Sequence, residues 1–254
     1  MTTLSPEISL GASAVDERAL RRDLAALYRL VALYRWDDLI FTHISARLGD
    51  TEEFLLNPFG IGFDEMTASS LVKIDADGEP VGESDYRVNR AGFVIHSAVH
   101  LARPDVRCVI HLHSNDGVAV SAMEEGLLPL NQKVLGILAD VAYHDYEGVS
   151  LDLAERERLA ADLGSKHIMM LRNHGTLVAG TSVPEAFMRT YFLETSCTAQ
   201  VRTLGMGRPL RAVDPDVQAG AADKIGPENW ARMGREAWPT LLRKLDRLSP
   251  GYDA

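Results

Sequence analysis

The spacing of hydrophobic residues in the first fifth of the chain changes after residue 34. Before it, apolar side chains recur at helical intervals, at Leu20, Leu24, Leu27, Val31 and Tyr34. This spacing places them on one face, so we expect an amphipathic helix that Asp16 caps. The stripe is typical of a face that packs into a hydrophobic core.

Residues 39–48 alternate between polar and apolar side chains. An alternation of period two predicts a strand whose two faces differ in polarity. His43, Ser45 and Arg47 share the polar face, which could therefore border a pocket.

Residues 92–103 are expected to form a helix that ends before Pro104, and residues 106–113 a strand. His111 and His113 stand two residues apart on that strand, so both rings project from the same face. The Ser-Asn-Asp sequence that follows is typical of a turn into a helix. The two histidines are thus predicted at a strand end, where loops commonly build sites.

A third histidine, His174, lies between two further apolar runs, residues 167–171 and 176–180. Gly175 after it favours a tight turn, because it lets the backbone take a conformation that a side chain would resist. Three neutral imidazoles are typical of a catalytic divalent-metal site, which keeps one position open for water or substrate. We therefore predict metal ligands in this His-x-His pair and His174.

The remaining second half is expected to be mainly helical. Capping signals predict a helix opened by Asp152 and Glu155, one over about residues 184–204, and a closing helix over residues 228–248. Residues 211–226, rich in Ala, Asp and Gly, are expected to be an exposed linker.

The pattern predicts one main domain with short additions. Residues 1–15 are expected to be a flexible arm and residues 16–210 the domain. Residues 211–254 would supply the linker and a C-terminal helix whose apolar face packs on the body or on a neighbouring subunit.

Composition is that of an ordinary enzyme. The chain has 254 residues, 46% of them hydrophobic, which is enough to bury a full core. A net charge of −10 argues against binding to nucleic acid or to an anionic membrane. We find neither an apolar stretch of transmembrane length nor a signal peptide, so the cytoplasm is the expected location. Two cysteines, Cys108 and Cys197, are expected to be buried hydrophobic residues.

An ordered set of motifs gives the chain a family resemblance. It comprises residues 89–96, residues 102–106, the His-x-His pair and the Asn-His-Gly turn. In this order they resemble the class II aldolase/adducin N-terminal domain family over roughly residues 20 to 205. The resemblance implies a three-layer α/β/α fold with a mainly antiparallel central sheet, and usually a homotetramer with the metal site near a subunit interface. It places the family's three zinc-ligand histidines on His111, His113 and His174.

The chain departs from the sugar-phosphate aldolases of this family. Where they carry two serines for the phosphate and an acidic acid/base residue, this chain has Arg90, Ala91 and Gly92. At the two phosphate turns it has Thr42-His43, and Phe59-Gly60 in place of Thr-Gly. A phosphorylated sugar is therefore an unfavourable substrate. Arg90 could instead bind a carboxylate in bidentate fashion, or simply form a surface ion pair.

Proton transfer needs another group, because a metal alone seldom completes a lyase cycle. The candidates are His96, His43 and His144, the last in a loop rich in titratable side chains. A structural role for His96 in the core or at a helix cap, and a solvated turn at His144, are the alternatives. The predicted substrate contacts are Arg90, Phe59, Gly60, Asn57 and Ser45.

These features favour a divalent-metal-dependent lyase, acting by retro-aldol cleavage or decarboxylation on a small non-phosphorylated, carboxylated substrate. Zinc is the expected ion, with manganese or iron as alternatives. Two other functions stay open: a non-haem iron oxygenase on the same three histidines, and a non-catalytic, adducin-like interaction module.

Overall fold

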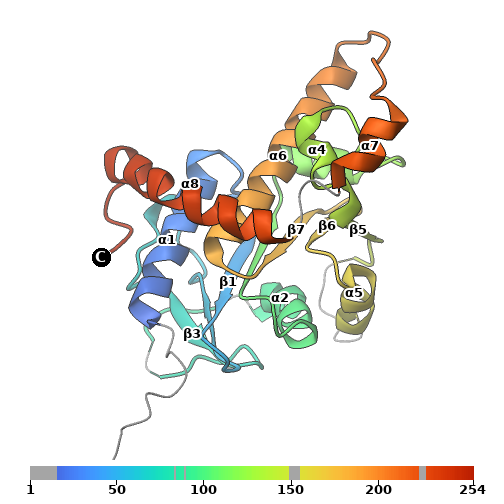
Figure 1. Ribbon diagram of the computed structural model, residues 1–254. Helices are drawn as coiled ribbons and strands as arrows, with labels where there is room; N and C mark the ends of the chain where they lie inside the picture. Colours follow the sequence, from blue (N-terminus) through green and yellow to red (C-terminus); the bar gives the residue numbers. More distant parts are fainter. Residues whose placement is uncertain (1–15, 83, 89, 149–154, 223–226) are drawn as a thin grey trace, which may run out of the picture.

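The computed structural model describes residues 16–82, 84–88, 90–148, 155–222 and 227–254. A seven-stranded sheet with the order β3-β2-β1-β4-β7-β6-β5 forms its centre (Figure 1). Neighbouring strands are antiparallel except β5 and β6, which are parallel. The strands are β1 (His43–Arg47), β2 (Phe54–Leu56), β3 (Val72–Ile74), β4 (Cys108–Leu112), β5 (Val141–His144), β6 (Ile168–Leu171) and β7 (Gly175–Gly180).

Helices cover both faces of this sheet, which confirms the predicted α/β/α fold. They are α1 (Glu17–Leu33), α2 (Arg90–Ala102), α3 (Asn115–Ser121), α4 (Gln132–Leu135), α5 (Glu155–Leu163), α6 (Val183–Gly205), α7 (Pro215–Ala222) and α8 (Pro227–Leu248), with short 3₁₀ turns η1 (Phe63–Glu65) and η2 (Leu138–Asp140). Helices α2 and α5 bury one face of the sheet, and α1, α6 and α8 the other. No helix within the described residues is both long and apolar enough to cross a membrane.

Helix α1 forms as its apolar stripe predicts. The Asp16 side chain accepts a hydrogen bond from the Arg18 amide (3.1 Å), which confirms the expected cap. Leu24, Leu27 and Val31 are completely buried against the sheet. Burying each of these side chains contributes roughly 1.5–3 kcal/mol, so packing rather than the cap provides most of the stability of this helix.

The first strand is shorter than the alternation predicted, since it begins at His43 rather than near residue 39. Leu39 and Thr42 have φ angles of 51° and 71°, in the left-handed region that extended strands exclude. The Phe41 amide donates to the Asp38 carbonyl (2.8 Å), which closes a tight turn in front of the strand. This turn lies directly before the polar face that carries His43.

The expected turn between β6 and β7 is present, but its geometry differs from the prediction. Asn173, with a φ of 56°, takes the left-handed conformation. Gly175 is required for another reason, because a Cβ there would lie 2.3 Å from the Leu112 carbonyl oxygen of the neighbouring strand. The glycine therefore lets β4 and β7 approach closely beside His174.

The C-terminal part packs onto the body of the same subunit. Trp230 and Trp238 of α8 are buried in the core shared with α6. The stretch expected to be an exposed linker has no buried residue among its described residues, and it contains a helix, α7, that its composition did not predict. Residues 1–15 and the predicted cap at Asp152 lie outside the described residues.

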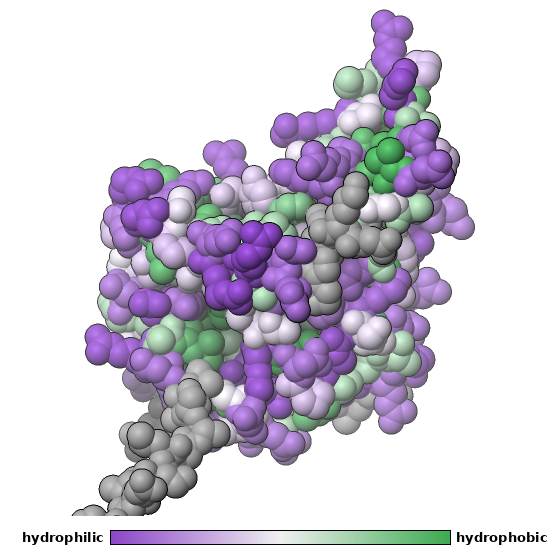
Figure 2. All heavy atoms as spheres, viewed as in Figure 1, coloured by the Kyte–Doolittle hydropathy of each residue, from purple (hydrophilic) through white to green (hydrophobic). Residues whose placement is uncertain are grey.

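Figure 2 shows mainly hydrophilic side chains on the face viewed, with small and scattered hydrophobic areas between them. Cys108 and Cys197 are both free and completely buried, as expected.

Candidate metal centre

Three histidines converge at one end of the central strands. One ring nitrogen of each of His111, His113 and His174 lies within 4.8 Å of those of the other two. The register of β4 on β7, which pairs Leu112 with Thr176, explains this proximity. It sets the end of β4 beside the turn that carries His174. Strand pairing therefore brings together His113 and His174, which are more than sixty residues apart in the sequence.

The ring orientations of two of these histidines are fixed by hydrogen bonds. His111 Nδ1 lies 3.0 Å from the Thr176 carbonyl oxygen, and His113 Nδ1 lies 3.1 Å from Asp38 Oδ2. Carbonyl and carboxylate oxygens only accept hydrogen bonds, so each Nδ1 carries the proton and each Nε2 has a lone pair. The two Nε2 atoms lie 3.0 Å apart, an arrangement that needs a cation or a shared proton between them. The donor set therefore fits a divalent metal ion, with His174 completing it.

Burial keeps His111 and His174 neutral, which is the form that binds metal. Burial, with a smaller effect of His174, holds the pKa of His111 well below its usual value. Burial lowers the pKa of His174 to about 4. Both rings therefore offer lone pairs at neutral pH without first losing a proton.

A second group of polar residues lies beneath α2, beside the three histidines of the candidate metal centre. His43 pairs with His111 in the strand register, and its ring centroid is 5.9 Å from that of His96. Ser45 Oγ lies 2.7 Å from His96 Nδ1 and 2.8 Å from His100 Nε2. Ser45 is completely buried beside these two histidines.

Two of the candidate acid/base histidines belong to this group. Burial lowers the pKa of His43 to about 4 and holds the pKa of His96 well below its usual value. His96 is completely buried, and its Nε2 has no hydrogen-bond partner among the described residues. The structure thus brings His43 and His96 next to the three histidines of the candidate metal centre, with His96 in the core.

The third candidate, His144, ends strand β5 rather than lying in a loop, so that prediction was wrong in its local structure. Its Nδ1 lies 2.7 Å from Asp162 Oδ2, and its Nε2 lies 3.7 Å from Glu155 Oε1. A cavity of about 10 Å³ is lined by both His144 and His174. His144 is therefore near the cluster but held between two carboxylates.

The predicted substrate residues are divided between surface and core. Phe59 is 44% exposed, and an added Cβ at Gly60 would meet open space. Asn57 is buried, and its side-chain oxygen accepts a hydrogen bond from the Tyr28 hydroxyl (2.9 Å). Arg90 begins α2, but its side chain lies outside the described part of the structure.

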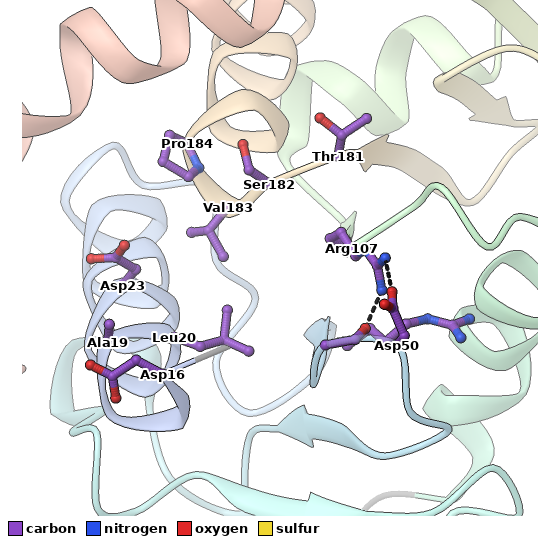
Figure 3. A pocket seen from close by; sticks show the side chains of 12 residues that line it. Asp16, Ala19, Leu20, Asp23, Asp50, Arg107, Thr181, Ser182, Val183 and Pro184 are labelled. Carbon is purple, nitrogen blue, oxygen red and sulfur yellow. Dashed lines mark hydrogen bonds and ion pairs between the residues drawn. The ribbon is translucent and has the colours of Figure 1, made fainter. Parts of the chain in front are cut away.

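A larger cavity, of about 490 Å³, lies at the opposite ends of the central strands. Figure 3 shows Arg107 and Asp50 on one side of it, joined by an ion pair of 2.5 Å, and the start of α6 on another. Arg107 precedes β4 and Thr181 follows β7, whereas the histidines lie at the other ends of these strands. This cavity is thus separate from the candidate metal centre.

Three residues of the site's surroundings were not predicted from the sequence. Asp38 and the Thr176 carbonyl contact the histidines only through strand pairing and a turn, which leave no mark in the local sequence. Glu194 is a buried carboxylate in α6, seven residues after buried Phe187 and three before buried Cys197. A charged residue at an apolar position of a helix was the signal that could have revealed it.

Comparisons with known proteins agree with this architecture. Residues 22–201 match the family described as "Class II Aldolase and Adducin N-terminal domain". A Caulobacter vibrioides protein named "Putative aldolase class 2 protein" is 53% identical, over 97% of each chain. Mouse alpha-adducin is 43% identical over 93% of this chain, which spans 34% of the adducin.

Two solved structures give the same result. The aldolase II superfamily protein from Pseudomonas syringae superposes with a TM-score of 0.88 at 45% identity, covering 95% of this chain and 98% of that one. The L-fuculose 1-phosphate aldolase from Glaciozyma antarctica has a TM-score of 0.81 at 28% identity, covering 96% of each chain. Together with the three converging histidines, these matches show that the chain belongs to the class II aldolase and adducin N-terminal domain family.

Proposed function

We propose that this protein is a divalent-metal-dependent carbon–carbon lyase in which His111, His113 and His174 bind the ion. The observation that carries the proposal is the 3.0 Å distance between the Nε2 atoms of His111 and His113, with an acceptor oxygen beside the Nδ1 atom of each ring. Zinc suits three neutral imidazoles, and manganese or iron would also bind them.

The ion, when bound, would polarise a substrate carbonyl or hydroxyl oxygen and stabilise an enolate. The chain's own residues would move the proton. Burial lowers the pKa of both His43 and His96, so each ring is neutral and would hold a proton only transiently, taking it at a ring nitrogen and returning it after bond cleavage. The Ser45 hydroxyl, which is hydrogen-bonded to His96 Nδ1, holds that ring in place. His144, oriented by Asp162, is the alternative proton-transfer group.

The proposed substrate is small, carboxylated and not phosphorylated. The family's phosphate-binding serine pair is replaced by Arg90-Ala91, and Phe59 stands at the second phosphate turn. A guanidinium suits a carboxylate, while the half-exposed Phe59 ring offers an apolar contact. The relative named L-fuculose 1-phosphate aldolase makes a sugar phosphate the first competitor to test.

Metal analysis of the purified protein, followed by cleavage assays with hydroxy-keto acids and with L-fuculose 1-phosphate, tests the proposal. We expect one metal ion per chain in the wild type. A folded His113→Ala variant should lose both the metal ion and the cleavage activity. Full metal content in a variant with all three histidines changed to alanine would refute the ligand assignment. Cleavage of the sugar phosphate alone would refute the substrate class.

A non-catalytic interaction module is the second candidate, because alpha-adducin is 43% identical to this chain. Such a module has no need for stoichiometric metal. The same metal analysis therefore separates the two functions.

A further inference from the structure

Glu194 is a carboxylate in the middle of α6 that is 1% exposed. A buried carboxylate is costly unless hydrogen bonds compensate for the lost water. Its two oxygens accept from two different parts of the chain. Ser114 Oγ donates to Oε2, and Thr176 Oγ1 donates to Oε1 (2.8 Å).

Both hydroxyl groups lie next to the proposed metal ligands. Ser114 directly follows His113, and Thr176 comes two residues after His174. The carbonyl of Thr176 also accepts the hydrogen bond from His111 Nδ1 (3.0 Å). One carboxylate thus connects the segments that carry all three histidines.

The space around this carboxylate leaves little room for adjustment. A Cβ at Gly117 would lie 2.6 Å from Ser114 Oγ, 3.0 Å from Thr176 Cγ2 and 3.3 Å from Glu194 Oε2. Ser114 Oγ already accepts the Gly117 amide hydrogen (3.1 Å), so its own proton is directed to Glu194. The direction of the Ser114 hydroxyl is therefore fixed by the Gly117 amide on one side and the Glu194 carboxylate on the other.

We infer that Glu194 is a positioning residue, which sets the distance between the β4 end and the β6–β7 turn and thereby the geometry of the three-histidine site. This role rests on the proposed function, because it presupposes that the histidines bind metal. Groups that hydrogen-bond a metal ligand directly commonly contribute about 10- to 100-fold to metal affinity, and Glu194 acts one residue further from the ligands, so its contribution should be smaller.

Glu185 offers a matched control on the same helix. It is also buried, accepts from the Thr181 hydroxyl and pairs with Arg189 (2.9 Å). Thr181 follows the end of β7 that lies away from His174. Replacing Glu185 should therefore reduce stability without changing the metal site.

The experiment compares Glu194→Gln, Thr176→Val and Glu185→Gln by chelator competition for zinc and by the visible spectrum of the cobalt-loaded protein. Glutamine cannot accept from both hydroxyls, and valine removes one of them while keeping the Thr176 carbonyl. Burial raises the pKa of Glu194 to about 7, with its two hydrogen bonds opposing, so measurements at pH 8 keep the carboxylate charged.

We expect about 3- to 10-fold weaker zinc binding and an altered cobalt spectrum for Glu194→Gln, a smaller loss for Thr176→Val, and neither change for Glu185→Gln. Zinc affinity within twofold of the wild type in both site variants would overturn the inference. An equal loss in Glu185→Gln would also overturn it, since general weakening of α6 would then explain the effect. A wild type without metal affinity would instead overturn the proposed metal site, and this role with it.

Discussion

At the scale of single residues, the candidate metal centre depends on which nitrogen of each ring is free. His111 and His113 both have Nδ1 occupied, one by a backbone carbonyl and one by a carboxylate. The carboxylate contact of His113 does more than orient the ring, because a negatively charged partner also makes an imidazole a stronger metal ligand. Asp38 is thus expected to affect affinity as well as geometry.

We predict that Asp38→Ala weakens zinc binding by about 10- to 100-fold while the protein stays folded. The loss follows from freeing His113 to rotate and to take the other tautomer. Asp37→Ala is the matched control, because no hydrogen bond joins Asp37 to the histidine cluster among the described residues. Titration of metal-free protein with zinc measures both, and equal affinity in the two variants would contradict the assignment.

At the scale of elements, α2 packs onto β1 and β4 through polar residues as well as hydrophobic ones. Burial lowers the pKa of His100 to about 3 and that of His43 to about 4 in the folded protein. In the unfolded chain both return to about 6.5. Between these values the unfolded state binds more protons, so the free energy of unfolding falls as the pH decreases below 6.5.

The metal-free protein should therefore lose stability on acidification from pH 6.5 to 5, by up to about 1.4 kcal/mol per pH unit for each such histidine. Glu194 acts in the opposite direction, because its raised pKa lets the folded state hold a proton there. Urea unfolding of the wild type and of His100→Gln tests this. The variant should show a slope lower by up to about 1.4 kcal/mol per pH unit, and an identical slope would show that His100 is not neutral in the folded state.

At the scale of the whole molecule, the apolar face of the C-terminal helix α8 packs within its own subunit, so it does not require a neighbouring subunit to cover it. Apolar side chains are exposed elsewhere. In the turn before β1, Leu39 is 74% and Phe41 49% exposed, beside the Asp38 that contacts His113. An assembly of the kind that the family resemblance implies would cover such residues.

We predict a tetramer at micromolar concentration, and a smaller assembly when Leu39 and Phe41 are both changed to serine. Light scattering measures the mass of each. Met206→Ser is the control, because Met206 is 66% exposed at the far end of α6. A monomeric wild type would refute the tetramer, and a double variant of unchanged mass would place the interface elsewhere.

The sequence by itself determined the parts of this protein that depend on local patterns. Helical spacing and caps predicted α1 and α6, and the apolar run with its two histidines predicted β4, which is shorter than expected because it ends at Leu112, one residue before His113. Hydrophobic periodicity is local, so it specifies an element wherever packing agrees with it. The short strands β2, β3 and β5 were not predicted, because three or four residues carry little periodic signal, whereas the equally short β6 was marked by a continuous apolar run and the turn after it.

Only the tertiary structure decided how these elements make a site. Pairing of β4 with β7 brought His174 to His111 and His113, and a turn 75 residues away supplied Asp38. Glu194 became part of the same junction through the packing of α6. Hydrogen bonds between distant segments depend on register and packing, which the order of residues in any one segment does not contain.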